Sequence, residues 1–228
     1  MVFAKTYSHP FHLPLEKTAL LVIDMQNDFC HPDGFNSSEL ALDVTGVRAI
    51  IPSIQTLLVW ARQTEIQVIF TRESHAPDLS DLTASKQTRY ANAGSPIGQR
   101  GKMGRFLVRG EPGAALIDEL QPQPQEWQLD KPAHSCFVAT DLDQKLRIAR
   151  ITHLLIAGVT TQCCVLATYR HASDLGYYCL LLEDCCAAFN PQDHDATVHI
   201  LQSESGVLGW VGNSPQLFES LSALATEG

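Results

Sequence analysis

Two adjacent cysteines mark the most reactive stretch of the sequence. Cys163 and Cys164 lie in the segment Gly158–Val165, between an apolar run, His153–Ala157, and an amphipathic stretch that starts at Val165. This pattern predicts a buried strand, a tight turn and a helix, with one or both thiols in the first helical turn. Because a helix N-terminus favours an anion, a thiol there can have a pKa below its free value of roughly 8.5 and act as a nucleophile. The alternative is that both are simply small buried residues, as free cysteines commonly are.

Two charged residues at the ends of other predicted strands complement a thiol. Asp24 ends the apolar run Thr18–Asp24, and Lys131 ends Glu126–Lys131. Ligands bind outside the carboxyl ends of parallel strands, so both residues and the cysteine turn are expected at one sheet edge. There the aspartate can take the thiol proton and return it to a leaving amine, while the lysine stabilises the thiolate and the ionised aspartate. Singly, Asp24 could be an exposed acid and Lys131 a solvated charge, but the three roles together indicate catalysis.

Strands and helices alternate along the sequence, which favours a three-layer α/β/α fold with a mainly parallel, Rossmann-like sheet of about six strands. The strands are expected at Thr18–Asp24, Gln67–Thr71, Glu126–Lys131, His153–Ala157, Tyr178–Leu182 and Gly206–Val211. The helices are expected at Val47–Gln63, Ala114–Leu120, Asp141–Arg150, the cysteine segment up to about Leu175, Asp195–Gln202 and Pro215–Leu224. Met25–Asn36 is expected to be a loop, and Arg72–Gly110 a long functional loop or lid. The length of 228 residues predicts a single domain, residues 1–228.

The composition excludes several classes of function. Hydrophobic residues make up 45 % and charged residues 18 %, as in soluble globular proteins, and the net charge of −9 disfavours a nucleic acid or an anionic membrane as partner. The sequence shows neither the apolar run of a spanning helix nor the apolar core of a signal peptide. Seven cysteines without an export signal indicate free thiols in a reducing cytoplasm, and the lack of CxxC spacing argues against structural zinc.

Three motifs, in this order, resemble those of the isochorismatase-like superfamily of cysteine hydrolases. They are LVIDMQNDF at 21–29, DKP at 130–132 and GVTTQCCV at 158–165. The resemblance implies a catalytic triad of Asp24, Lys131 and Cys164, because the family's nucleophile directly precedes the valine. It also implies a cis peptide bond between Val159 and Thr160. Such a turn would aim the N–H groups of Thr160 and Cys164 at one point and form an oxyanion hole.

Segments outside the triad resemble the biuret hydrolases of this superfamily. These segments are Thr71–Leu79, Arg109–Gly113, Phe137–Leu142 and Cys179–Cys186. The resemblance implies an amidohydrolase that cleaves a C–N bond of a small ureide, first of all biuret to allophanate and ammonia. Glu204 departs from the glutamine that biuret hydrolases carry, so triuret, ureidoacrylate and carbamoylsarcosine stay open. A carboxylate only accepts hydrogen bonds and therefore suits a substrate rich in N–H donors, unless Glu204 is a surface acid.

Further substrate contacts are predicted in the loops. Phe29 and Phe35 could wall the pocket, and Arg105 could hold a carbonyl or a carboxylate by paired hydrogen bonds, although packing or solvation would also explain each of them. Nicotinamidases add a metal site, built from an acid and two histidines after the second strand. Here His75 stands alone without an Asp-x-His pattern, so we expect no metal and no other cofactor and interpret His75 as a polar loop residue.

A second class of function remains open. A thiol-based redox or soft-metal-binding protein could use two adjacent pairs, Cys163 with Cys164 and Cys185 with Cys186, although Asp24 would then have no role. The resemblance also implies a homo-oligomer, a tetramer by analogy, in which neighbouring subunits close the pocket.

Overall fold

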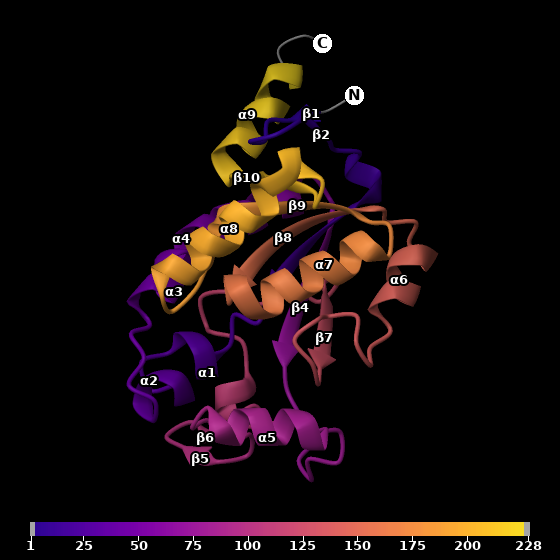
Figure 1. Ribbon diagram of the computed structural model, residues 1–228. Helices are drawn as coiled ribbons and strands as arrows, with labels where there is room; N and C mark the ends of the chain where they lie inside the picture. The colour runs from indigo at the N-terminus through magenta and orange to yellow at the C-terminus, as the bar shows by residue number, and fades with distance from the viewer. Residues whose placement is uncertain (1–2, 226–228) are drawn as a thin grey trace.

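Six segments form one parallel sheet in the computed structural model, which describes residues 3–225 (Figure 1). The strands are β3 (Thr18–Ile23), β4 (Gln67–Glu73), β7 (Trp127–Lys131), β8 (His153–Val159), β9 (Tyr178–Ala187) and β10 (Trp210–Gly212). Their order in the sheet is β10-β9-β8-β3-β4-β7, and every neighbouring pair is parallel. The predicted three-layer fold with a Rossmann-like sheet of about six strands is confirmed.

Successive residues of each strand pack against different helical layers, because side chains alternate across a sheet. On β3, Leu20 and Val22 join one core, whereas Leu21 and Ile23 join the other. The first core lies under α3 (Thr45–Ala49), α4 (Ile51–Gln63) and α9 (Ser214–Ala225). The second lies under α6 (Leu142–Ile148), α7 (Leu166–Asp174) and α8 (Pro191–Gly206). The helices therefore cover both faces of the sheet (Figure 1).

Several predicted boundaries are corrected by the structure. The helix expected at Val47–Gln63 is divided at Ile50, because Pro52 has no N–H to continue the helical ladder. Strand β9 runs five residues beyond Leu182, since its end pairs again with β8 after a bulge. Helix α8 starts at Pro191 rather than Asp195, because the Asn190 side chain caps its first turn.

The sixth strand and one predicted helix differ more strongly. Gly206–Val211 contains positive φ angles at Gly206 and Gly209, so β10 begins only at Trp210. Ala114–Leu120 is not a helix, because Leu116 forms a bridge with Gln26 of the loop after β3. Only the short 3-10 turn η2 (Pro112–Ala114) precedes it.

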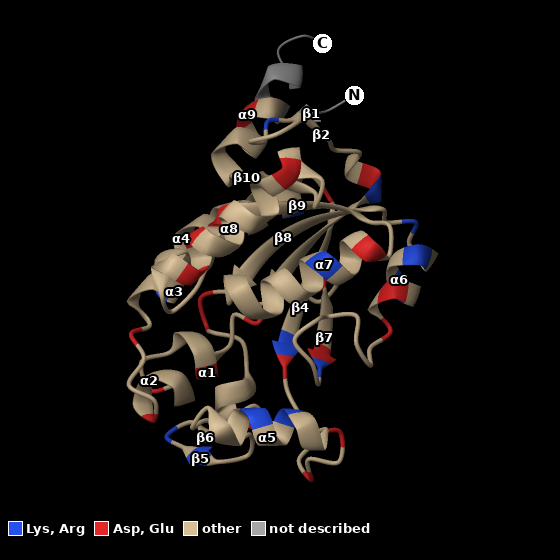
Figure 2. Ribbon diagram, viewed as in Figure 1, with Lys and Arg blue, Asp and Glu red and all other residues tan. Residues whose placement is uncertain are grey.

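The segments expected to be loops contain short elements above the carboxyl ends of the strands. These elements are α1 (Asn27–Cys30), α2 (Phe35–Ser38), α5 (Ala84–Asn92), β5 (Arg100–Gly101) and β6 (Gly104–Arg105). The arrowheads of β4 and β7 point toward α5 in Figure 1, and Figure 2 shows basic residues on α5 facing mixed charges at those strand ends. At the opposite side, the chain starts with β1 (Phe3–Ala4), β2 (Phe11–His12) and η1 (Leu15–Lys17).

Within residues 3–225, no helix has both the length and the apolar character needed to cross a membrane.

Candidate active site

Asp24 and Lys131 meet at the carboxyl edge of the sheet. Asp24 follows β3 with a φ of +51°, a left-handed conformation that aspartate tolerates better than most residues. Lys131 ends β7, two strands away from β3 in the sheet, and its Nζ lies 2.7 Å from Asp24 Oδ2. Both side chains are 0 % exposed, and Thr71 donates a hydrogen bond of 2.7 Å to Asp24 Oδ1. Burial alone would lower the pKa of Lys131, but the negative charges of Asp24 and Glu73 hold it well above its usual range.

Cys164 lies in the turn between β8 and α7. The peptide bond between Val159 and Thr160 is cis, and the turn continues as one π-helical segment, η3 (Thr161–Val165). Gly158 has a φ of +117°, and a Cβ there would stand 2.1 Å from the carbonyl oxygen of Ile23, so only glycine lets β8 pass β3 so closely. The turn buries Cys164 to 4 % exposure beside the ends of β3 and β4.

Glu73 is a functional candidate that the sequence analysis missed. It is the last residue of β4, pairs in register with Lys131, and is 1 % exposed. The Cys164 thiol donates to Glu73 Oε2 across 3.1 Å, and Lys131 Nζ lies 3.8 Å from the same oxygen. Burial opposes ionisation of Glu73, but the positive charges of Lys131 and Lys86 keep its pKa below the usual range. A second strand-end acid could have been found had the second strand been extended by two residues.

Helix α5 supplies the second cation of the cluster. Lys86 Nζ lies 2.5 Å from Glu73 Oε1, 2.8 Å from the Pro132 carbonyl oxygen and 3.0 Å from His75 Nε2. His75, interpreted above as a polar loop residue, is fully buried in the loop after β4, and its Nδ1 lies 3.0 Å from Asp81 Oδ1. Burial and the charge of Lys86 lower the pKa of His75, so its neutral ring can accept from Lys86.

One group of side chains in the described part of the chain has the spacing of metal ligands. The donor atoms of Asp24, Glu73 and Cys164 all lie within 4.8 Å of one another. The ammonium group of Lys131 contacts both carboxylates of this group, so a protein cation already neutralises them. A metal ion would have to displace this buried lysine, so the three side chains do not fit a metal site.

Cys163 differs from Cys164 in exposure and charge. It is partly exposed and lines the cavity described below. Contact with the Cys164 thiol and a hydrogen bond with His134 lower the pKa of Cys163 to about 5, while contact with Cys163 and burial raise the pKa of Cys164. His134 is held in turn by the Tyr90 hydroxyl, 3.1 Å from its Nε2. In the free protein, negative charge is therefore more stable on Cys163 than on Cys164.

A cavity of about 480 Å³ opens onto both thiols. Its floor includes Glu73, His134, Val159, Thr160, Cys163 and Cys164, and its walls include Phe29, Tyr90, Phe106 and Arg89. Arg89 is the one arginine or lysine among the lining residues, and its Nε makes only a long contact of 3.4 Å with the Ser85 carbonyl oxygen. The cavity therefore combines aromatic walls, a buried charge cluster and a cation near its mouth.

Of the four predicted substrate contacts, only Phe29 lines this cavity. Phe35 is buried behind the wall, where it stacks on Phe106 with ring centroids 4.2 Å apart. Arg105 is bound elsewhere, because its guanidinium group pairs with Glu111 at 2.7 Å and donates to the Pro77 carbonyl oxygen. Glu204 is exposed near the end of α8, where its own φ of +52° breaks the helix. The structure thus places these three residues outside the cavity.

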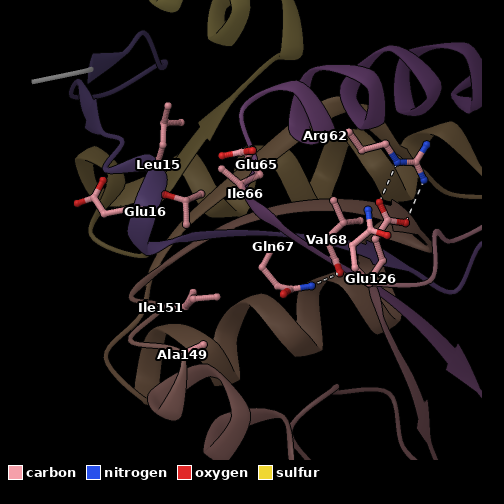
Figure 3. Close-up of a pocket in the computed structure, with 12 residues that line it drawn as sticks. Leu15, Glu16, Arg62, Glu65, Ile66, Gln67, Val68, Glu126, Ala149 and Ile151 are labelled. Carbon is pink, nitrogen blue, oxygen red and sulfur yellow. Dashed lines mark hydrogen bonds and ion pairs between the residues drawn. The ribbon is translucent and has the colours of Figure 1, made fainter.

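A second hollow of about 540 Å³ lies at the opposite edge of the sheet, between the amino ends of β3 and β4 (Figure 3). Its charged side chains include Arg62 and Glu126, which pair with each other at 2.8 Å. No cysteine lines it, so the reactive groups favour the cavity beside Cys164.

Cys185 and Cys186 do not form one cluster with Cys163 and Cys164. Both lie within β9, so their side chains enter different cores: Cys185 packs under α4, whereas Cys186 packs on the face of α7. Burial raises the pKa of both thiols, and neither contributes to a possible metal-binding group among the described residues. The geometry therefore gives no support to a four-cysteine redox or soft-metal site.

Comparisons with known proteins agree with this geometry. A model of the isochorismatase domain matches residues 18–211. The ureidoacrylate amidohydrolase RutB of Yersinia enterocolitica is 33 % identical over 208 residues, which are 90 % of this chain and 89 % of that protein. A cysteine hydrolase from Pseudomonas syringae superposes with a TM-score of 0.79 and 25 % identity, over 96 % of this chain and 98 % of that one. An isochorismatase family protein from Desulfovibrio vulgaris gives a TM-score of 0.74 and 27 % identity, over 90 % and 98 %.

Proposed function

Because the chain belongs to the isochorismatase family, we propose that it is a cysteine-dependent amidohydrolase that cleaves a C–N bond of a small linear ureide. The observation that supports this most is the contact of a cysteine, two carboxylates and a lysine in one buried cluster, of which Cys164 and Glu73 line the cavity. Each group has a separate task in amide hydrolysis, and Cys164, Asp24 and Lys131 are the proposed triad. The relatives named above include an amidohydrolase of a ureide, which agrees with this class of substrate.

The first half of the reaction forms a thioester. The Cys164 thiol transfers its proton to Asp24, and Sγ attacks the carbonyl carbon of the ureide. The N–H groups of Thr160 and Cys164 stabilise the oxygen of the tetrahedral intermediate. Asp24 then gives its proton to the leaving nitrogen, the C–N bond breaks, and ammonia or an amine departs. Lys131 keeps Asp24 ionised between these steps and stabilises the thiolate by its charge.

The second half regenerates the enzyme. Asp24 takes a proton from water, the hydroxide attacks the thioester carbon, and the bond from Sγ to carbon breaks. The thiolate recovers the proton from Asp24, so the full cycle consumes one water molecule. With biuret, the substrate first indicated by the sequence, the products are allophanate and ammonia.

Arg89 favours a second candidate substrate, an anionic ureide such as ureidoacrylate. Its guanidinium group lines the cavity and, within residues 3–225, forms no ion pair with an acidic side chain. A carboxylate at the far end of a ureide could take this position, whereas biuret has no group of that charge. The name of the Yersinia relative points to the same compound.

The test is ammonia or amine release from biuret, triuret, ureidoacrylate and carbamoylsarcosine by the wild type, Cys164→Ser and Cys163→Ser, with chelator present. Cys164→Ser is expected to retain less than roughly a thousandth of the activity, as for other covalent nucleophiles, whereas Cys163→Ser retains turnover. Equal activity in Cys164→Ser and the wild type would refute the mechanism. The ranking of the four substrates separates the biuret proposal from the anionic one.

The same family resemblance underlies our proposals of a homo-oligomer, a tetramer by analogy, and of a cytoplasmic location. Sedimentation of the purified protein would test the former.

A further inference from the structure

We propose that Glu73 is a positioning residue that holds the Cys164 proton in the free enzyme and releases it when an N–H group of the substrate takes its place. This inference rests on the proposed ureide hydrolysis and adds a reason for its selectivity. The nucleophile would then be activated by substrates that carry an N–H next to the scissile carbonyl.

The contacts of the Glu73 carboxylate leave one oxygen available for exchange. Oε1 is held by Lys86 at 2.5 Å and by the Tyr90 hydroxyl at 2.9 Å. Oε2 accepts from the Cys164 thiol at 3.1 Å, and its other polar neighbour, Lys131 Nζ, stands 3.8 Å away. A thiol is a weak donor, so an amide N–H that enters the cavity can replace it. Because α5 fixes Oε1, the carboxylate can change its partner without moving.

Asp24 offers the displaced thiol a second acceptor. Its Oδ2 is a buried oxygen to which no N–H or O–H in the described chain donates a well-aligned hydrogen bond, although Lys131 forms an ion pair with it at 2.7 Å. The acceptor atoms of Asp24 and Glu73 and the sulfur of Cys164 lie within 4.8 Å of one another. Rotation of the thiol from Glu73 toward Asp24 therefore places its proton on the residue proposed as the base.

The charges around the thiol explain why the free enzyme keeps it protonated. The buried cluster contains two carboxylates, Asp24 and Glu73, and two ammonium groups, Lys86 and Lys131, so its net charge is already zero. A Cys164 thiolate would add one uncompensated negative charge out of contact with water. Transfer of the proton to Asp24 leaves the sum unchanged. Beside Cys164, the pKa of Cys163 is lowered and that of His134 is raised, so the opposite charges of this second pair offset each other. The other titratable neighbours are Tyr90 on Glu73 Oε1, His75 beside Lys86, and Cys136 near Lys131.

This arrangement predicts which substrates can be hydrolysed. Ureides present N–H groups on the nitrogens that flank the carbonyl, and one of them can donate to Glu73 Oε2. An ester or a fully N-methylated urea has no such donor, so it would leave the thiol bound to Glu73. We therefore expect at least a tenfold lower kcat/KM for an analogue methylated at these nitrogens than for its parent.

The decisive variant is Glu73→Gln, compared with Glu65→Gln, an exposed acid at the opposite edge of the sheet. Both variants also carry Cys163→Ser, so that alkylation of the peptide that contains residue 164 reports on Cys164 alone. The pKa of Cys164 is read from the pH dependence of its alkylation by iodoacetamide. We expect Glu73→Gln to lower this pKa by at least one unit and to raise KM for the ureide at least tenfold. A Cys164 pKa equal to or above that of Glu65→Gln would overturn the inference.

If Glu73→Gln fails to fold, the inference can still be tested on the wild-type enzyme. The pH profile of kcat/KM reports groups in the free enzyme, and that of kcat reports groups in the substrate complex. We expect the pKa of the Cys164 thiol read from kcat to be at least one unit lower than the pKa read from kcat/KM. Equal values in the two profiles would contradict the inference. If no ureide is turned over, the proposed function fails, but alkylation of the free enzyme still tests whether Glu73 holds the thiol proton.

Discussion

Lys131→Met should destabilise the fold as well as abolish activity, because Lys131 neutralises a buried carboxylate. Lys131 Nζ lies 2.7 Å from Asp24 Oδ2 with both side chains 0 % exposed, and Glu73 is the next carboxylate at 3.8 Å. Removal of one partner of a buried ion pair leaves the other charge uncompensated, at a cost of about 3–5 kcal/mol. Methionine has a similar length and fills the same space, so this cost measures the charge rather than a cavity.

The control is the double variant Asp24→Asn/Lys131→Met. Asparagine tolerates the φ of +51° at position 24 and can still accept from Thr71, so the double variant removes both charges at little geometric cost. We expect it to recover at least about 2 kcal/mol of the loss in the free energy of unfolding, measured by urea denaturation at pH 7.5. A Lys131→Met loss below about 1 kcal/mol, or a double variant as unstable as the sum of the single variants, would refute the assignment of a buried ion pair.

Three further predictions concern other described residues. Burial raises the pKa of Asp28 to about 6. A raised carboxyl pKa means that stability is lost as the pH rises through that value, so Asp28→Asn should be more stable than the wild type by about 1–3 kcal/mol at pH 8 and equally stable near pH 3.5. A constant difference in urea midpoints between these pH values would contradict this. Iodoacetamide should alkylate Cys163 first, with a midpoint near pH 5, since its pKa is lowered to about 5 by Cys164 and His134; fragment spectra that show Cys164 modified first would argue against the assignment. Arg89→Gln should raise KM for ureidoacrylate roughly 10–100-fold and leave KM for biuret within about twofold, because only the anionic substrate loses a charge-assisted hydrogen bond. Equal effects on both substrates would exclude Arg89 as a selectivity residue.

The sequence predicts the positions of residues at strand ends better than those of residues in loops. Asp24, Lys131 and Cys164 each adjoin a predicted strand, and parallel strands bring their carboxyl ends to one edge whatever the loops do. Phe35 and Arg105 belong to segments whose course depends on tertiary contacts, such as the stacking of Phe35 on Phe106 and the pairing of Arg105 with Glu111. No periodicity in a loop sequence predicts contacts of this kind.

The sequence predicts a substrate contact at Glu204, but the carboxylate that lines the cavity belongs to Glu73. Glu204 is predicted as a substrate contact because it departs from the glutamine of the biuret hydrolases, and a carboxylate there would suit a substrate rich in N–H donors. The exposed side chain at the end of α8 does not line the cavity, whereas Glu73 lies on its floor beside Cys164. A glutamate at this position would be costly to bury without cations, and Lys86 and Lys131 supply them from α5 and β7. The Asp24–Lys131 ion pair would be neutral without Glu73 and Lys86. Because the fold nevertheless buries this second acid and a second lysine beside the thiol, we assign Glu73 a role in the reaction rather than in packing.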